Sequence, residues 1–265
     1  MRTCDFETSI NFGTPGRAPA RVDLLEGGFR GFGDGERFSG IAGGGDSLAY
    51  GWVSARCLNV PYGLCDFCNP LGSCPLGVGG GGVALVPAQP TGQRPPVIPG
   101  LPTPAIFALS SSFVAVVPAR SPTPEGDWVP RVGDDGPVEV YDLSGRLSMR
   151  VQFIGMVRDV ALSGHTLAVL LERPDGSKII VRFDARSGAQ LSGYSAVPLG
   201  ATDLSTGTGG TVFRVGVNIY RLVGQKPSLV ARAAARPIGL SIEGRRIAWA
   251  VNLKGRARIV ALTLR

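Results

Sequence analysis

The sequence has a single histidine, three lysines and only 7% aromatic residues. One histidine cannot supply a multi-histidine metal site, and it argues against a catalytic triad built on histidine. No stretch approaches the roughly 20 consecutive apolar residues that a membrane-spanning helix needs. The first residues, MRTCDFETSI, lack the apolar core of a secretion signal.

Glycine and proline are abundant, with 39 and 21 copies in 265 residues. Both residues disfavour helix interiors, so a mainly helical fold is excluded. Hydrophobic residues make up 44% of the chain and charged residues 18%. A chain of this size and composition can bury a large core, which excludes disorder along its whole length.

Charge is distributed unevenly along the chain. Residues 1–204 carry 16 basic and 19 acidic groups, a net charge of −3, whereas residues 205–265 carry 11 basic groups and one acidic group, a net charge of +10. Such a cationic face attracts anionic polymers or an acidic protein, or it is a solvated face balanced by the rest of the molecule. Aromatic residues are not interleaved with the basic ones, which argues against nucleic acid.

Four of the five cysteines lie within eighteen residues: Cys57, Cys65, Cys68 and Cys74. The spacing allows two disulfides that hold a Gly- and Pro-rich loop, a zinc site with these four cysteines as ligands, or free thiols. Disulfides are favoured because only one of the two C-x-x-C knuckles of a zinc site is present. They would place the protein outside the cell or on its surface, with a signal already removed; otherwise it is cytoplasmic. Cys4 makes the count odd, which indicates a partner elsewhere.

A short pattern recurs along the chain: a turn of Gly or Ser is followed by an apolar strand with a small residue near its start. The copies are IAGGGDSLAYGWV (41–53), FALSSSFVAVVPA (107–119), VALSGHTLAVLLE (160–172), DLSTGTGGTVFRVGV (203–217) and LSIEGRRIAWAVN (240–252). Aligned on Leu48, Val114, Leu167, Val212 and Ile247, the next residue is alanine in every copy except the one with Phe213. A small residue at matching places suits close packing between neighbouring sheets.

Each copy is followed by a third apolar run, such as VEVYDLSGRL (138–147) or KIIVRFDARSGAQL (178–191), and three are followed by a fourth. In two copies the third run ends in a turn with Asp and Ser, at Asp142 and Asp184, where the carboxylate can accept backbone N–H groups. Four antiparallel strands repeated every 45 residues or so predict a β-propeller, an all-β fold of sheets arranged around an axis.

The runs VALSGHTLAVLL and IIVRFDARSGAQL resemble blades of the bacterial β-propeller superfamily that includes TolB-like and WD-repeat-like proteins. The resemblance covers residues 38–265 in five imperfect copies and concerns the fold. The chain departs from the WD pattern because no Gly-His and Trp-Asp pairs recur. It departs from the TolB pattern because the repeated Ser-Pro-Asp-Gly turn is absent.

The fifth copy ends at Arg265 after its third strand. Because an unpaired edge invites aggregation, the N-terminal segment 1–37 is expected to supply a closing strand, from residues 6–12 or 21–27. The prediction is a five-bladed propeller over residues 38–265; six blades result if residues 1–37 form a blade of their own. A Cys-rich insertion is expected at about residues 54–82, between the second and third strands of the first blade.

No nucleophile is flanked by a base, and the glycine clusters lack the helix that a phosphate site needs. His165 lies in a turn that differs between copies, so it is expected on the surface. Residues with a suitable position for binding are Trp128, Asp134, Asp135, Arg245 and Arg246. The sequence indicates no cofactor and no metal, apart from the four-cysteine alternative.

These features favour a non-catalytic propeller that presents loops to a protein partner or an anionic polymer, with the cysteine loop and residues 120–136 as contacts. One alternative is an extracellular polysaccharide hydrolase or lyase with its site at the mouth of the channel. Another is a structural subunit of a homo-oligomer or filament.

Overall fold

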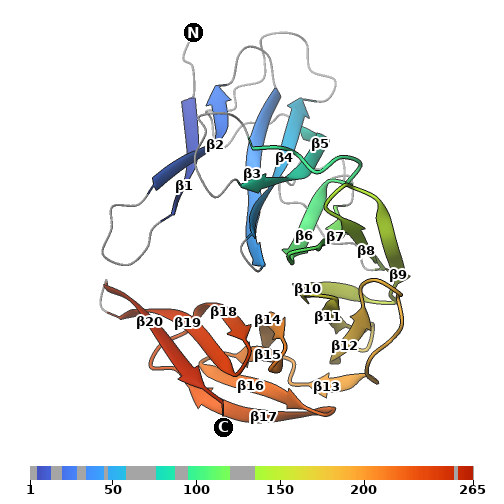
Figure 1. The fold of residues 1–265 in the computed structure, drawn as a ribbon, viewed down its shortest axis with the longest axis vertical. Coiled ribbons are helices and arrows are strands. Elements are labelled where there is room, and N and C mark those ends of the chain that lie inside the picture. The colour runs from blue at the N-terminus through green and yellow to red at the C-terminus, as the bar shows by residue number, and fades with distance from the viewer. Residues whose placement is uncertain are drawn as a thin grey trace.

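The computed structural model describes residues 5–12, 20–28, 34–44, 47–57, 76–86, 95–119, 135–253 and 256–264. Every regular element within these ranges is a β-strand, and all the sheets are antiparallel (Figure 1). In the part of the chain that is described, no helix is long and apolar enough to cross a membrane.

Five sheets of three or four strands form the body of the molecule, and a two-stranded sheet precedes them. The two-stranded sheet consists of β1 (Asp5–Phe12) and β2 (Ala20–Gly28). The first of the five comprises β3 (Asp34–Gly44), β4 (Ser47–Cys57) and β5 (Leu76–Val86). The second comprises β6 (Pro104–Leu109), β7 (Phe113–Pro118), β8 (Pro137–Asp142) and β9 (Leu147–Gln152).

The third sheet comprises β10 (Met156–Ser163), β11 (Thr166–Glu172), β12 (Lys178–Asp184) and β13 (Ser195–Val197). The fourth comprises β14 (Ala201–Gly207), β15 (Gly210–Val215), β16 (Asn218–Val223) and β17 (Lys226–Arg232). The fifth comprises β18 (Ile238–Glu243), β19 (Arg246–Leu253) and β20 (Arg256–Thr263). Within each sheet the strands pair in sequence order.

The five sheets are the blades of a β-propeller (Figure 1). Their first strands β3, β6, β10, β14 and β18 contact one another in succession around the axis. The core lies between adjacent sheets: one apolar cluster joins the second and third sheets, another the third and fourth, and another the fourth and fifth. Burial of this apolar surface between faces, rather than within one central core, holds the ring together.

The repeated small residue packs between sheets as the sequence predicted. Ala49, Ala115 and Ala168 are fully buried, each on the face that meets the next sheet. The structure corrects the alignment of the fourth copy by one residue. Its hairpin pairs Gly207 with Gly210, as Ser163 pairs with Thr166 in the third sheet, so Val212 and not Phe213 matches the alanines. Val212 is fully buried against the fifth sheet, so in this copy a valine takes the place of the alanine.

The Pro-rich link after the first sheet completes that sheet. The Leu85 N–H donates to the carbonyl of Pro96 at 2.9 Å, and the Ile98 N–H donates to the carbonyl of Val83 at 2.9 Å. Residues 96–98 therefore cover the edge of β5 through an isolated bridge between Ala84 and Val97. The expected insertion at about 54–82 is narrower at both ends, because β4 continues to Cys57 and β5 begins at Leu76.

The predicted closure of the ring by the N-terminal strand is not among the pairings of the described strands. Segments 6–12 and 21–27 pair with each other as β1 and β2, and among the described strands β20 pairs with β19 alone. Neighbouring segments close a short loop, whereas pairing the first strand with the last would close a loop of more than two hundred residues at a higher entropic cost.

The meander gives the ring two distinct ends. At one, here called the turn end, lie the tight turns that join the first and second strands of each sheet, such as residues 164–165 and 244–245. At the other, here called the loop end, lie the links between sheets and the connections between second and third strands. Cys57 and Leu76 lie at this end, as do Ala119 and Asp135; residues 58–75 and 120–134 between them are outside the described residues.

Candidate functional site: the loop end of the ring

The binding residues predicted from sequence fall at opposite ends of the ring. Asp135 precedes β8 and lies at the loop end. Arg245 and Arg246 are exposed at the β18–β19 turn and therefore lie at the turn end, so they cannot share one contact surface with Asp135. Trp128 and Asp134 lie outside the described residues.

The cysteine predictions also fall outside what the structure describes. Cys65, Cys68 and Cys74, between β4 and β5, lie outside the described residues. Cys4, which precedes β1, lies outside them too. Cys57 is the last residue of β4 and pairs with Leu76, the first of β5. The connection that carries the other three cysteines therefore starts and finishes at adjacent strand ends.

Asp135 holds the link between the second and third sheets. Its Oδ1 accepts a hydrogen bond from the Gly155 N–H at 2.7 Å, and the two residues form a parallel bridge. Gly155 has φ +111°, and a Cβ there would come within 2.3 Å of the carbonyl oxygen of Glu172. Only glycine fits this close approach, so the Asp135 side chain fixes a tightly packed corner of the loop end.

The first strand of each of the five sheets contains one register shift. The register shifts lie between Phe38 and Gly40, Pro104 and Ile106, Val157 and Asp159, Thr202 and Ser205, and Ile238 and Leu240. A bulge redirects side chains and increases local twist. Its recurrence brings the bulged residues Arg158 and Asp203 to the loop end.

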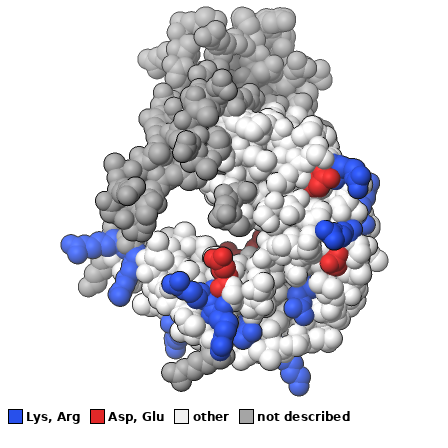
Figure 2. All heavy atoms as spheres, in the orientation of Figure 1, with Lys and Arg blue, Asp and Glu red and all other residues white. Residues whose placement is uncertain are grey.

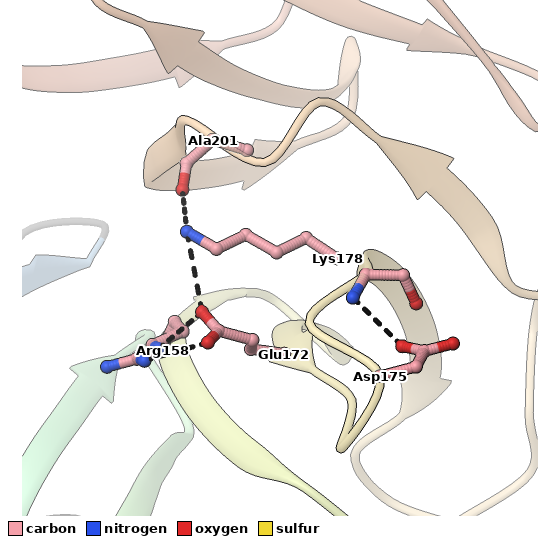
Figure 3. A network of polar contacts seen from close by, with 6 residues as sticks. Arg158, Glu172, Asp175, Lys178 and Ala201 are labelled. Atoms are coloured by element: carbon pink, nitrogen blue, oxygen red, sulfur yellow. Dashed lines mark hydrogen bonds and ion pairs between the residues drawn. The ribbon is translucent and has the colours of Figure 1, made fainter.

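Arg158, Glu172 and Lys178 form a charged network on the third sheet, from which Lys178 reaches the fourth (Figure 3). The Arg158 guanidinium donates to both Glu172 oxygens, at 2.9 and 3.0 Å. The Lys178 Nζ lies 3.8 Å from Glu172 and donates to the carbonyl of Ala201 at 3.1 Å. The hydrogen bond from Arg158 lowers the pKa of Glu172, and the charges of Arg158 and Lys178 add to this effect. Lys178 thereby links β12 to the first residue of β14.

Asp159 joins the same two sheets nearer the axis. One carboxylate oxygen accepts from the Val160 N–H at 2.9 Å and the other accepts from the Leu204 N–H of β14 at 2.7 Å. Burial raises the pKa of Asp159 to about 6, against the lowering effect of the hydrogen bonds from Leu204 and Val160, and the nearby Asp203 raises it further. A carboxylate with both oxygens engaged by backbone N–H groups is a structural link between blades.

Asp203 pairs with Arg214 on the neighbouring strand β15. Asp203 has φ +52°, a left-handed conformation that aspartate tolerates better than most residues. Arg214 is buried, with 6% of its surface exposed, so the pair compensates a guanidinium charge inside the protein. Asp159 and Asp203 are the acidic residues that two adjacent first strands bring together, and both are engaged by protein groups.

Three exposed apolar side chains lie at the loop end. Ile154 is 76% exposed and Leu199 is 67% exposed, and each lies two residues before the first strand of the next sheet. Ile238, 64% exposed, begins β18 and lies at the corresponding corner. Three successive sheets thus have an exposed apolar residue near the start of the first strand, in the link for Ile154 and Leu199 and within the strand for Ile238.

The surface around these residues is mixed in charge. On the face of the molecule that Figure 2 presents, acidic and basic side chains both occur among the described residues. At the loop end, Arg158 and Lys178 are balanced by Glu172, and the Arg173 guanidinium lies 5.3 Å from the centre of the Tyr194 ring. The described part of this end is therefore not a uniform cationic surface.

Sequence reasoning missed Arg158, Asp159, Glu172 and Lys178 as a connected group. Arg158 and Asp159 precede VALSGH, and Glu172 ends the LAVLLE run, so the repeat itself marks where strands begin and end. What the repeat does not show is which sheet edges meet, since that depends on the twist and packing of neighbouring blades.

The sequence matches no protein-family model and no curated protein. Among solved structures, the chain is similar to the acylaminoacyl peptidase of Pyrococcus horikoshii, with 12% identity and a TM-score of 0.50 over 92% of this chain and 38% of that one. It is similar to TolB from Acinetobacter baumannii, with 14% identity and a TM-score of 0.49 over 92% of this chain and 54% of that one.

A third similar structure is the β-propeller domain of the Trilobed protease from Pyrococcus furiosus, which has an open velcro topology. Identity is 10% and the TM-score 0.47, over 86% of this chain and 82% of that one. The chain spans only about half the length of TolB and less of the peptidase. At these identities the likeness concerns the fold alone. By its five packed blades, the chain is a β-propeller protein.

Proposed function

We propose that the protein is a binding propeller whose loop end docks a protein partner. The observation that carries the proposal is that Ile154, Leu199 and Ile238 are all exposed at the loop end, each near the start of the first strand of one of three successive sheets. The buried centre of a protein interface is apolar, so exposed apolar side chains on several sheets at one end of the ring favour docking of a protein there. The two long connections that leave from the same end, residues 58–75 and 120–134, would add contacts.

A protein partner is preferred to an anionic polymer at this end. Apolar anchors surrounded by paired charges suit a protein interface, whereas a polyanion needs unpaired cations. Arg158 and Lys178, which could serve a polyanion, are already held by Glu172. For a polysaccharide hydrolase, Asp159 and Asp203 would have to face a sugar, and their hydrogen-bonding positions are taken by Leu204, Val160 and Arg214.

The proposal is tested by site-specific photo-crosslinking in the organism's own cells. A photo-reactive residue at position 154 or 199 should crosslink to one and the same partner, identified by mass spectrometry. Val223, 60% exposed at the end of β16, lies at the turn end and is the matched control position. Replacing Ile154 and Leu199 by serine should remove the crosslink from a third position at the loop end and leave the circular dichroism spectrum unchanged. Equal crosslinking from position 223 would contradict the proposal.

An extracellular or cell-surface location belongs to the same proposal and rests on the cysteine spacing. The intact mass of the protein isolated from its own cells, before and after reduction, tests it. A gain of two hydrogens per bridge on reduction is expected from two disulfides among Cys57, Cys65, Cys68 and Cys74. An unchanged mass, or a bound zinc ion, would point to the cytoplasmic alternative.

A further inference from the structure

The last described strand, β20, is the third strand of its sheet. In the other sheets the outer edge of the third strand is covered by a neighbouring segment. The third strands β8, β12 and β16 are each paired on their outer side, with β9, β13 and β17. In the first sheet, residues 96–98 cover β5. Among the described strands β20 pairs only with β19, over eight residues from Arg256 to Thr263. One edge of a long third strand is thus left without a described neighbour.

The outer edges of the other sheets carry features that discourage further pairing. β9 has the exposed Arg150 in its middle, β13 is three residues long, and β17 begins with Lys226 and Pro227. Charge, proline and shortness are the usual protections of an edge strand. The middle of β20, residues 259–262, is Ile-Val-Ala-Leu without charge, and Ile259 is 79% exposed.

The face of the fifth sheet that points away from the fourth has the composition of a packed face. Ala248 pairs with Ala261, and Ala250 pairs with Ile259. Ala248 matches Ala115 and Ala168, which are fully buried between sheets, yet Ala248 itself is only half-buried. A strand added to β20 would extend this face and shield Ile259.

The charge around this edge selects the kind of segment that it would accept. Residues 236–265 contain seven basic groups and one acidic group, a net charge of +6. Arg245, Arg246, Arg256 and Arg258 are all exposed. A second copy of this chain would bring charge of the same sign to the edge, so an acidic segment is favoured.

We propose that β20 binds an extended segment of a partner protein as a fourth strand, and that this segment carries Asp or Glu on either side of a short run of small or β-branched residues. Backbone hydrogen bonds to β20 would supply affinity, and the flanking carboxylates would face the arginines. The site is separate from the loop end and does not depend on the function proposed there.

A synthetic ten-residue peptide of alternating valine and threonine, with glutamate at both ends and a fluorescent label, is the probe. Its binding to the full chain is measured by fluorescence anisotropy, together with amide hydrogen exchange of the protein. Saturable binding and slower exchange at residues 259–262 are expected. The same peptide with lysine ends should bind at least about tenfold more weakly, because it meets the arginines with like charge.

Ile259→Lys separates strand addition from attraction of charge alone. The variant adds a positive charge at an exposed position, so a purely electrostatic complex would tighten, whereas strand addition should weaken by about tenfold or more because the isoleucine would no longer be buried. Val223→Lys, at a similarly exposed apolar position, is the control and should bind as the unmodified chain does.

Three results would overturn the proposal. The first is no binding of the glutamate-ended peptide. The second is equal binding of a version with proline at its centre, which cannot pair as a strand. The third is light scattering or amide exchange showing that β20 is occupied by a second copy or by residues 5–12 of the same chain. None of these results bears on crosslinking at the loop end.

Discussion

Single glycines decide how closely neighbouring blades approach at the turn end. A Cβ on Gly209 would lie 1.7 Å from the carbonyl oxygen of Gly244, and one on Gly44 would lie 2.1 Å from the carbonyl oxygen of Leu109. In both places the obstacle is backbone of the next sheet, which cannot turn away as a side chain can. Glycine is required at these two positions by inter-blade packing.

Gly209→Ala is therefore expected to destabilise the protein by about 1 to 3 kcal/mol, the usual cost of overpacking. Urea unfolding of the variant measures the loss. Gly40→Ala is the matched control, since its Cβ would meet only the Phe107 ring at 3.5 Å, an ordinary contact. Equal stability of the two variants would contradict the packing described here.

The turns after the third strands show how a local sequence signal builds an element. The Asp142 carboxylate accepts from the N–H groups of Ser144 and Arg146 at 2.9 and 3.0 Å. Asp184 accepts from the N–H groups of Arg186 and Ser187 at 3.0 and 2.8 Å, and the glycine that ends each turn has positive φ. The sequence predicted both turns, because Asp, Ser and Gly at these offsets satisfy the turn without help from distant residues.

Acid should weaken the Asp184 turn. The hydrogen bonds from Ser187 lower the pKa of Asp184 below its ordinary value of 3.8, so the turn stays intact in mild acid and loosens as the pH falls through the lowered pKa. The NMR shift of the Ser187 amide proton, followed against pH, should titrate below 3.8. Asp184→Ala should abolish the titration, whereas Asp175→Ala, in a turn at the other end of the ring, should leave it in place.

The ring as a whole is held by apolar faces between blades and by a few polar links that cross them. Such links include the Ser110 hydroxyl to the carbonyl of Gly164, the Ile242 N–H to the Ser205 hydroxyl, and Asp159 to Leu204. Each joins residues 37 to 54 positions apart, which is the spacing of the repeat. Their effect on stability therefore concerns the association of whole blades.

Asp159 should make the third and fourth blades separate more easily at neutral pH than in mild acid. Because its folded pKa of about 6 exceeds the ordinary 3.8, the folded protein binds the proton more readily than the unfolded chain. Stability from this group is thus greatest at low pH and falls by on the order of 3 kcal/mol as the pH rises from about 4 to about 6. The side chain of the Asp159→Asn variant does not titrate. Urea unfolding should therefore show the free energy of unfolding of the variant rising relative to that of the unmodified protein over this pH interval. A pH-independent difference between the two would contradict the assignment.

The repeat in the sequence determined the all-β class, the five blades, most strand positions and the Asp turns, because each of these depends on local alternation and turn chemistry. The repeat did not determine which residue of each copy faces the neighbouring sheet. The copy with Val212 could be aligned correctly only from its hairpin pairing. The tertiary structure alone decided that the N-terminal strands pair with each other, that residues 96–98 cover β5, and that Arg158, Glu172 and Lys178 meet. These outcomes depend on which edges lie side by side once the blades twist and pack, and on the entropy of closing long loops, neither of which a local pattern contains.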